Sequence, residues 1–534
     1  MAQAKKQSFF GGAAVLAAGV VVVKIIGAIY KIPLYNILGP EGNASFTNAY
    51  NIYAALLTVS TTGLPVALSK MVSEANALAR ENQARRIFRV SAATFLTLGV
   101  LSFCIMWFGN SWCAQRLNWP PAAYGIRTLA PAVVCVGALS AFRGYAQGTS
   151  RMTPTAVSQI IEAVCKLVVG LTLAQYLINA GQELPVAAAG AIAGVTVGTV
   201  LAVAYMAVDY FRHRAPASTN DIPDGGGKIL KRLVSIAVPI TLSTSMVSII
   251  TLIDTSLLQG QLQNALGLSE KETGTLYGTY ASGMNIYNLP SSMMTALTIS
   301  VLPAVSAALA RRDRTQTARV VGSSLRVTGL IAFPMGLGIW ALAEPIFKLL
   351  YPRYDSVLGG QLLAVLGLAS LFVCLMLIAN SILQAHGRVH APIVTMLIGG
   401  VVKIVLNYNL SAVPSINIHA APIGTLCCFA VVAVLNLLLV YRTVEDKPNY
   451  LALFSKPLLA SLAMAFCAKG CYALLAAHVT LSSGTLTRVV NVGVSVVLAI
   501  AVYTALVIAL RIITRDDLAL LPKGEKLARL LRIK

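Results

Sequence analysis

Two lysines interrupt an apolar run near the start of the chain, in the stretch VVVVKIIGAIYKIPLY of residues 20–35. Lys24 and Lys31 are seven residues apart, so on a helix they share one face and lie about 10 Å apart along the axis. The stretch contains no Asp or Glu that would neutralise them. Two such cations indicate a wet cavity that receives an anion. The alternative is that their ammonium groups extend to the membrane surface and bind nothing.

Further charges lie inside apolar runs, where each requires a partner or a water-filled cavity. Glu162 and Lys166 have the i,i+4 spacing in the favoured order, so they could form a structural ion pair. Lys403 has no acid at that spacing. We expect Lys166 and Lys403 to bind the same anion as the first two lysines, with Arg143 as a further cavity cation. Glu162 would then balance charge or take part in ion coupling.

Asp254 is the only acid in the apolar run SIITLIDTSLLQ. It could pair with a cation across a cavity, or titrate or bind an ion during transport. It could equally be an acid at the outer membrane surface, since Gln259 and Gln261 follow soon after. We therefore expect either charge balance and ion coupling, or an interfacial position.

Prolines and polar residues mark two apolar runs as predicted gates. YASGMNIYNLPSSMMTALTISVLP contains Asn285 and Pro290, and STTGLP contains Pro65. A proline frees backbone carbonyls and kinks a helix, and a kinked polar helix next to a cavity suits a gate. The alternative is the ordinary tolerance of membrane helices for proline.

The composition is that of a polytopic helical membrane protein. Of the 534 residues 57% are hydrophobic and only 11% are charged, whereas soluble domains average about 25% charged residues. The net charge of +22 is explained by basic cytoplasmic loops, so we expect membrane lipids and no nucleic acid as partners. Walker A, nucleophile-elbow and HExxH motifs are absent from the sequence, and we expect no enzyme activity.

Fourteen apolar runs are each long enough to span a bilayer as a helix. Cations follow the even-numbered runs and occupy both chain ends, which predicts a plasma-membrane protein with both termini in the cytoplasm. The runs cover approximately residues 13–36, 48–73, 87–108, 124–146, 154–178, 186–211, 232–257, 276–307, 320–343, 358–384, 392–411, 419–441, 452–476 and 487–511.

An internal repeat and a polar linker predict two lobes. Sequences around Pro65 and Pro154 resemble those around Pro303 and Pro392, and both pairs are 238 residues apart. The stretch 213–231 is rich in Pro, Gly and Asp. We expect two six-helix lobes in the same membrane orientation, with a cleft between them that suits alternating access. The expected divisions are a lobe at 1–215, a linker at 216–231, a lobe at 232–446, and two further helices with a basic tail at 447–534.

The nine cysteines and five histidines form no CxxC pair or zinc pattern. We expect no metal and no cofactor. A coupling ion, H⁺ or Na⁺, or the membrane potential would supply the driving force. A monomer is compatible with the sequence.

Several motifs resemble one transporter family. These are KIIGAIYKIPLYNILGPEG, YNIYAALLTVSTTGLPVALSKMVSE, FRGYAQGTSRMTPTAVSQIIE and GGVVKIVLNYNL with INIHAAPIGT. In this order they are similar to the stage V sporulation protein B branch of the polysaccharide transporter family, within the multidrug/oligosaccharidyl-lipid/polysaccharide exporter superfamily. That branch is related to the lipid II flippases.

The resemblance implies a fourteen-helix, two-lobe, V-shaped fold that moves a lipid-linked oligosaccharide, such as a peptidoglycan precursor, across the membrane. It places Lys24 where those flippases carry a cavity arginine, and Lys31 about one residue from a second. The chain departs from them in AALLTVSTTG and YASGMNIYN, which lack the further arginines found there. We therefore expect an alternating-access flippase with an anionic head group in a cationic cavity between the lobes. The alternatives are a cation-coupled drug or solute exporter and a non-transporting scaffold for cell-wall or spore assembly.

We expect Lys24→Ala to abolish transport of the lipid-linked substrate, since the deeper lysine of the first run would be lost from the cavity. A flipping assay with purified, reconstituted protein measures this. Full activity in a normally expressed variant would remove Lys24 from the site.

Overall fold

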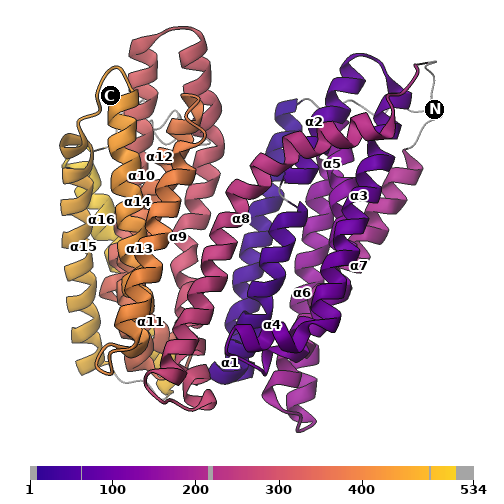
Figure 1. The fold of residues 1–534 in the computed structure, drawn as a ribbon. Coiled ribbons are helices and arrows are strands. Elements are labelled where there is room, and N and C mark those ends of the chain that lie inside the picture. The colour runs from indigo at the N-terminus through magenta and orange to yellow at the C-terminus, as the bar shows by residue number, and fades with distance from the viewer. Residues whose placement is uncertain (1–8, 62, 214–220, 480–482, 513–534) are drawn as a thin grey trace. The chain divides into compact units, whose positions relative to one another are not determined.

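The structure is a computed structural model, and it describes residues 9–61, 63–213, 221–479 and 483–512. These residues form helices joined by short connections, with no β-strand among them (Figure 1). Residues 216–220 of the predicted linker and the basic tail beyond residue 512 lie outside the described residues.

Each predicted membrane run falls on one or two of the described helices. In the described part of the chain, eleven helical stretches are long and apolar enough to cross a membrane. Helices α1 and α2 count together as one of these stretches, and α8 and α9 are not among the eleven. The prediction of an all-α polytopic membrane protein is confirmed, while the number of fourteen spans stays a prediction.

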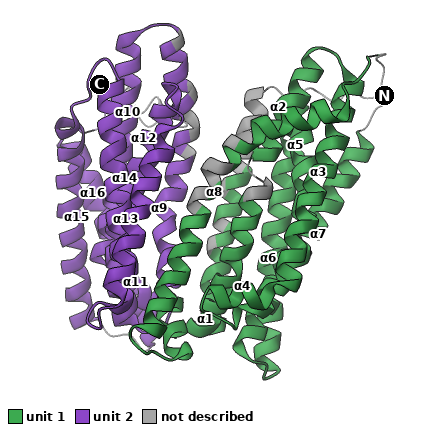
Figure 2. Cartoon of the chain, in the orientation of Figure 1, with its two compact units in different colours: residues 1–278 green, residues 279–534 purple. Residues whose placement is uncertain are grey.

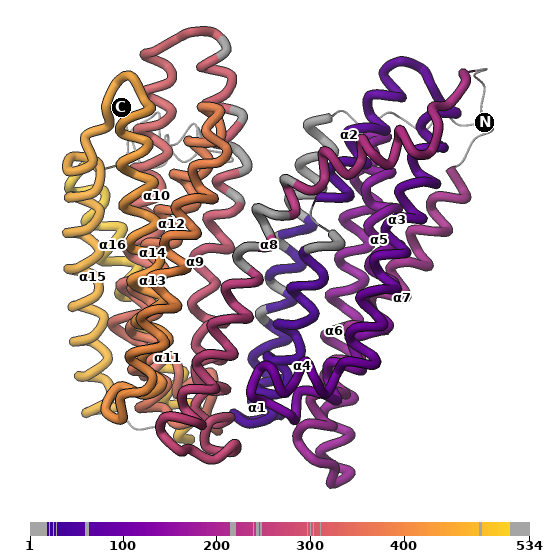
Figure 3. The backbone as a smooth tube through the Cα atoms, viewed as in Figure 1, coloured from indigo at the N-terminus to yellow at the C-terminus, as the bar shows by residue number. Residues whose placement is uncertain are grey.

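Two compact units divide the chain at residues 278 and 279 (Figure 2). Unit 1 contains α8, which packs on α1, α2 and α3 (Figure 3). The lobes expected from the sequence divide the chain earlier, at 216–231, and that division stays a prediction. Unit 1 contains α1 (Phe9–Thr61), α2 (Gly63–Ala77), α3 (Glu81–Phe108), α4 (Asn110–Arg116), α5 (Ala122–Gly148), α6 (Thr153–Asn179), α7 (Leu184–Arg212), α8 (Gly226–Asn264) and the first residues of α9 (Glu270–Ala310).

Unit 2 continues from residue 279 and contains the rest of α9. Its apolar core joins residues of α9, α10, α12, α14 and α15, including Val301, Leu325 and Ile378. The further elements are α10 (Arg314–Ala341), α11 (Ala343–Leu350), α12 (Ser356–Ala385), α13 (Ala391–Ser411), the short 3₁₀-helix η1 (Asn417–His419), α14 (Ala420–Thr443), α15 (Tyr450–His478) and α16 (Gly484–Ala509).

Helix α1 consists of two helical arms that meet at Gly39, whose φ is 68° and ψ −177°. Glycine adopts this backbone conformation without the steric cost that a Cβ would bring. Pro40 suits the first turn of the second arm because it has no N–H to satisfy there. Lys31 lies on the first arm and Tyr50 on the second, so the break at Gly39 allows both to contribute to one site.

Small residues let α6 and α7 approach closely. A Cβ on Gly194 of α7 would lie 2.5 Å from the backbone nitrogen of Gly170 of α6. Such close approach is how membrane helices gain packing energy in the absence of a hydrophobic driving force between them. Helix α6 is thereby fixed between α7 and α1, with which it also packs.

The connection before α8 binds to the start of α3 in unit 1. The carboxylate of Asp221 accepts the backbone N–H groups of Asn82 at 3.0 Å and Gln83 at 2.9 Å. The side chain of Gln83 donates to Asp224 at 2.9 Å and accepts its backbone N–H at 2.6 Å. A carboxylate at the first turn of a helix satisfies free N–H groups and opposes the positive end of the helix dipole. The connection is thus a docked segment that positions α8.

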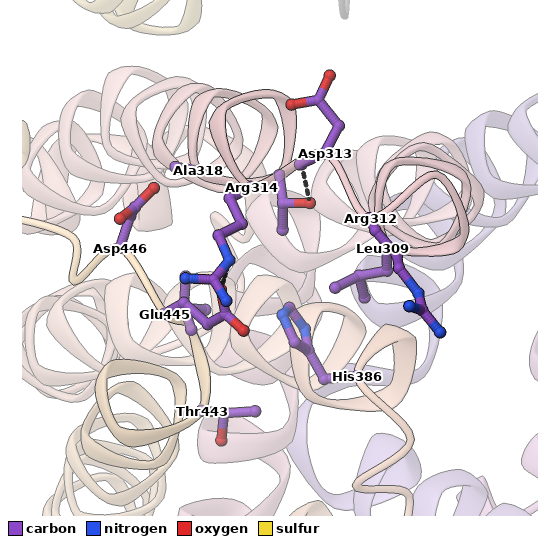
Figure 4. A pocket seen from close by; sticks show the side chains of 11 residues that line it. Leu309, Arg312, Asp313, Arg314, Ala318, His386, Thr443, Glu445 and Asp446 are labelled. Atoms are coloured by element: carbon purple, nitrogen blue, oxygen red, sulfur yellow. Dashed lines mark hydrogen bonds and ion pairs between the residues drawn. The ribbon is translucent and has the colours of Figure 1, made fainter.

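In unit 2, the free N–H groups at the start of α10 are capped by the residue directly before that helix. Asp313 caps α10 by accepting the backbone N–H of Gln316 at 2.9 Å. The connection after α14 reaches the same helix end, where Glu445 forms an ion pair with Arg314 at 2.5 Å. These groups line a cavity of about 360 Å³ (Figure 4), and His386 is also on its wall. Its lining charges are of both signs, so the cavity has no excess of cations that would select an anion.

We expect Asp221→Ala to lower the free energy of unfolding by about 1–2 kcal/mol, because two backbone donors of α3 lose their acceptor. Thermal unfolding of the purified protein measures the change. Asp446→Ala, which removes an acid from the connection after α14, is the matched control and should change stability by less than about 0.5 kcal/mol. Equal losses in both variants would contradict the docking role.

Candidate functional site

The ammonium group of Lys166 lies against two tyrosine rings in unit 1. Its Nζ is 5.1 Å from the ring centroid of Tyr30 and 4.6 Å from that of Tyr50. Tyr30 is buried, and its hydroxyl donates to the carbonyl of Ala191 at 3.3 Å, which fixes the ring. Tyr50 stacks on Phe46 with 5.9 Å between the ring centroids. A cation within about 6 Å of an aromatic face is stabilised by the negative face of the ring.

Lys31 adds a second cation to this place. It is half-buried on the first arm of α1 and interacts electrostatically with Tyr50 and with Lys166. Like charges repel each other, and an anion bound by both lysines would relieve the repulsion. Lys24, seven residues earlier on the same arm, is exposed.

Glu162 forms its ion pair with Arg143, which comes from α5. The distance between the Arg143 guanidinium and the Glu162 carboxylate is 2.5 Å. The Nε of Arg143 donates to Ser158 at 2.9 Å, and Thr199 donates to Glu162 at 3.4 Å. The side chains of Arg143 and Glu162 are 18% and 26% exposed, so water screens the pair only partly.

This pairing changes the interpretation of two charges. The i,i+4 spacing suggested a Glu162–Lys166 pair, but the hydrogen-bonded partner of Glu162 is Arg143, and its influence on Lys166 is electrostatic at longer range. Arg143, expected to be a cavity cation, is paired with this carboxylate, and its cavity role stays a prediction. We call Lys31, Lys166, Arg143 and Glu162 the charged cluster.

The remaining predicted residues lie elsewhere. Asp254 on α8 is 4% exposed, so it is inside the protein rather than on its surface. Lys403 is half-buried on α13 of unit 2. The predicted gating residues lie at three places: Pro65 is buried near the start of α2, Pro290 is buried within α9, and Asn285 donates to the hydroxyl of Tyr351 at 3.3 Å. Their role in gating stays a prediction.

A polar seam, which the sequence interpretation missed, joins the second arm of α1 to α8 within unit 1. Asn48 and Gln259 exchange two hydrogen bonds between their side-chain amides, at 3.2 and 2.8 Å. Asn51 donates to Thr255 at 3.3 Å, and the hydroxyls of Thr58 and Ser248 are 3.1 Å apart. A sequence signal was present, because the polar residues of both helices recur at intervals of three, four or seven and therefore share one face.

The charged cluster is equipped for binding an anion. Its cations come from α1, α5 and α6, and the tyrosines add flat amphipathic surface beside them. Lysine ammonium groups bind phosphate as point charges that leave the geometry of the ligand free.

Comparisons with known proteins agree with a transport role. Residues 9–309 match the family model described as polysaccharide biosynthesis protein, and residues 239–409 match the model named MatE. The first match covers more than half of the chain.

Three relatives from Bacillus subtilis (strain 168) extend over most of the chain. The uncharacterized membrane protein YabM is 26% identical and covers 99% of this chain and 97% of its own. The lipid II flippase MurJ is 25% identical over 75% of this chain and 76% of its own. Stage V sporulation protein B is 22% identical over 97% of this chain and 98% of its own. The resemblance seen in the motifs is confirmed.

Solved structures confirm the type of fold. An inward-facing multidrug resistance MATE family transporter of the MOP superfamily covers 80% of this chain and 98% of its own, with a TM-score of 0.66 and 16% identity. The lipid II flippase MurJ in an inward closed conformation covers 92% of this chain and 98% of its own, with a TM-score of 0.65 and 14% identity. Where these matches carry a molecular function, it is transport or flipping rather than enzyme chemistry.

We expect Asn48→Ala to destabilise unit 1 by about 1–3 kcal/mol, because the buried amide of Gln259 would lose its main partner. Thermal unfolding measures this effect. The double variant Asn48→Leu/Gln259→Leu removes both polar groups and is the control, which should recover much of the loss. A single variant as stable as the unsubstituted protein would show that the seam contributes little.

Proposed function

The chain belongs to the polysaccharide biosynthesis protein family, and from this premise we propose that it is a flippase for a lipid-linked oligosaccharide. The substrate class that we propose is a prenyl-diphosphate-linked sugar, such as a peptidoglycan precursor. The named functions of two relatives, lipid II flippase and stage V sporulation protein B, support this class.

The observation that carries the proposal is the pair of lysines beside the tyrosine rings in unit 1. Lys31 and Lys166 interact across α1 and α6, while the nearby Glu162 is bound to Arg143. An ionised side chain within a membrane-spanning helix is costly, and it is retained where function requires it. The two lysines are therefore suited to receive the two phosphates of a diphosphate head group.

Cations inside the spanning helices suit the transfer of a sugar–diphosphate head group across the membrane. A sugar–diphosphate head group cannot cross about 30 Å of hydrocarbon without a polar path. Cations in the spanning helices lower the cost of transferring the diphosphate, while its prenyl chain remains among the lipid tails. Helices α15 and α16 are suited to guide that chain, as the resemblance to lipid II flippases implies. Binding has to remain moderate, since the substrate must also be released.

We propose that transport follows alternating access in the plasma membrane, with both chain termini in the cytoplasm. Related solved transporters of the superfamily exist in inward-facing and outward-facing conformations, which supports such a cycle. Lys24 and Lys403 are proposed further contacts of the head group. Asp254 is the candidate for coupling to H⁺ or Na⁺, and the membrane potential is the alternative driving force.

A second candidate function is cation-coupled export of a drug or small solute. The MatE match and the multidrug transporter fold favour it. A carrier for organic cations would require acids to dominate its binding site, whereas cations outnumber acids in the charged cluster. A non-transporting scaffold for cell-wall assembly would leave the intramembrane charges without a role in activity.

We expect Lys166→Ala to lower the flipping rate at least tenfold, because one of the two free phosphate ligands is lost. The assay uses purified protein in liposomes, with fluorescent prenyl-diphosphate sugars and with or without an ion gradient. Lys469→Ala is the matched control, since Lys469 also lies over an aromatic ring, 5.6 Å from that of Trp340, but on α15. Activity that is unchanged in Lys166→Ala, or lost equally in both variants, would contradict the proposed site.

A further inference from the structure

The charged cluster contains three cationic side chains and one acid. With both lysines protonated, Lys31, Lys166 and Arg143 each contribute one positive charge and Glu162 removes one, which leaves two positive charges. Lys24 lies about 10 Å further along α1 and is exposed, and Asp254 is buried on α8, so neither is counted in the cluster. The cluster therefore presents a charge of +2 to a ligand.

A disubstituted diphosphate, with a prenyl chain on one phosphate and a sugar on the other, carries one negative charge on each phosphate. The common membrane phospholipids are phosphodiesters and carry only one charge on their phosphate. In a site of low dielectric, a complex without net charge is favoured over one with an uncompensated charge. A cluster with a charge of +2 forms a neutral complex with the diphosphate. Its complex with a phosphodiester keeps one uncompensated positive charge.

Glu162 is held in a way that suits a permanent counter-charge. Its carboxylate is bound by Arg143 at 2.5 Å and by Thr199 at 3.4 Å, and Ser158 holds the guanidinium at 2.9 Å. The guanidinium is thus occupied in the absence of a ligand, and the two lysines are the remaining cations of the cluster.

We propose that Glu162, held by Arg143, sets the charge of the binding site at two positive charges, so that a disubstituted diphosphate forms an electrically neutral complex there. Glu162 and Arg143 are positioning residues that tune the two lysines without contacting the substrate. The inference rests on the proposed function and adds the residues that determine selection of its ligand.

The test compares two probes that share a prenyl chain and a sugar but differ in linkage. One is the prenyl-diphosphate sugar with two charges, and the other is the prenyl-monophosphate sugar, a phosphodiester with one. Equilibrium binding to the full-length protein in nanodiscs is measured at low and high salt. The variants are Glu162→Gln, which makes the site +3, Arg143→Gln, which makes it +1, the double variant, which restores +2, and Glu162→Asp, which keeps the charge.

Glu162→Gln should tighten binding of the diphosphate probe about tenfold and of the monophosphate probe about threefold, since the Coulomb energy scales with the charge of the ligand. Its flipping rate should fall, because release becomes slower. Arg143→Gln should weaken binding of both probes. The logarithm of the change in affinity should again be about twice as large for the diphosphate probe as for the monophosphate probe. The double variant and Glu162→Asp should bind both probes within about threefold of the unsubstituted protein. High salt should reduce these differences only slightly, because partly buried charges are screened much less than exposed ones.

A purely structural role would instead change the affinities of both probes equally, and the double variant would bind as poorly as the worse single one. Either result overturns the inference. Glu162→Gln and Glu162→Asp alone decide the question if Arg143→Gln fails to fold. If the unsubstituted protein binds neither probe, the proposed function is wrong. If it binds the diphosphate probe but its affinity does not change with the charge of the site, only the proposed role of Glu162 is wrong.

Discussion

Charge in a medium of low dielectric is the constraint on which this structure depends. Water is scarce in the spanning region, so each ionised side chain has to be stabilised by the protein or by a ligand. The charged cluster shows two ways of meeting this requirement. Arg143 and Glu162 neutralise each other. Lys166 lies on the faces of Tyr30 and Tyr50, which stabilise its charge without removing it.

The packing around the cluster holds its helices together and pairs their buried polar groups. Gly170 and Gly194 bring α6 and α7 together, and the hydroxyl of Tyr30 is bound to the backbone of α7 at Ala191. The polar seam between α1 and α8 satisfies buried amides in pairs rather than singly. Buried polar groups that are fully paired specify one arrangement of helices, since any slip along the seam would leave amides without partners.

The sequence makes the charged residues of the spanning helices easy to see, but not which of them pair. Lysines in apolar runs are conspicuous because such runs tolerate so few charges, and the helices follow from the length of the runs. The partner of Glu162 could not be predicted, because Arg143 lies nineteen residues away on a different helix, and only the packing of α5 on α6 brings them together. The role of Tyr50 depends on the backbone at Gly39, where a φ of 68° and a ψ of −177° set how the two arms of α1 meet. The polar faces of α1 and α8 were visible in the sequence as a periodicity, but the sequence did not show that these two helices pack on each other.

The capping of α3 and α10 has a consequence for the order of synthesis. Helix α10 carries its own capping acid, Asp313, which is available as soon as the helix is synthesised. Helix α3 has Glu81 in its first turn, but the acceptor for the N–H groups of Asn82 and Gln83 is Asp221, 139 residues after Asn82. Since chains fold from the N-terminus during translation, the start of α3 meets this acceptor only after the three candidate spans α5, α6 and α7 have been synthesised. Unit 1 thus acquires this contact late in synthesis, from the connection that leads into α8.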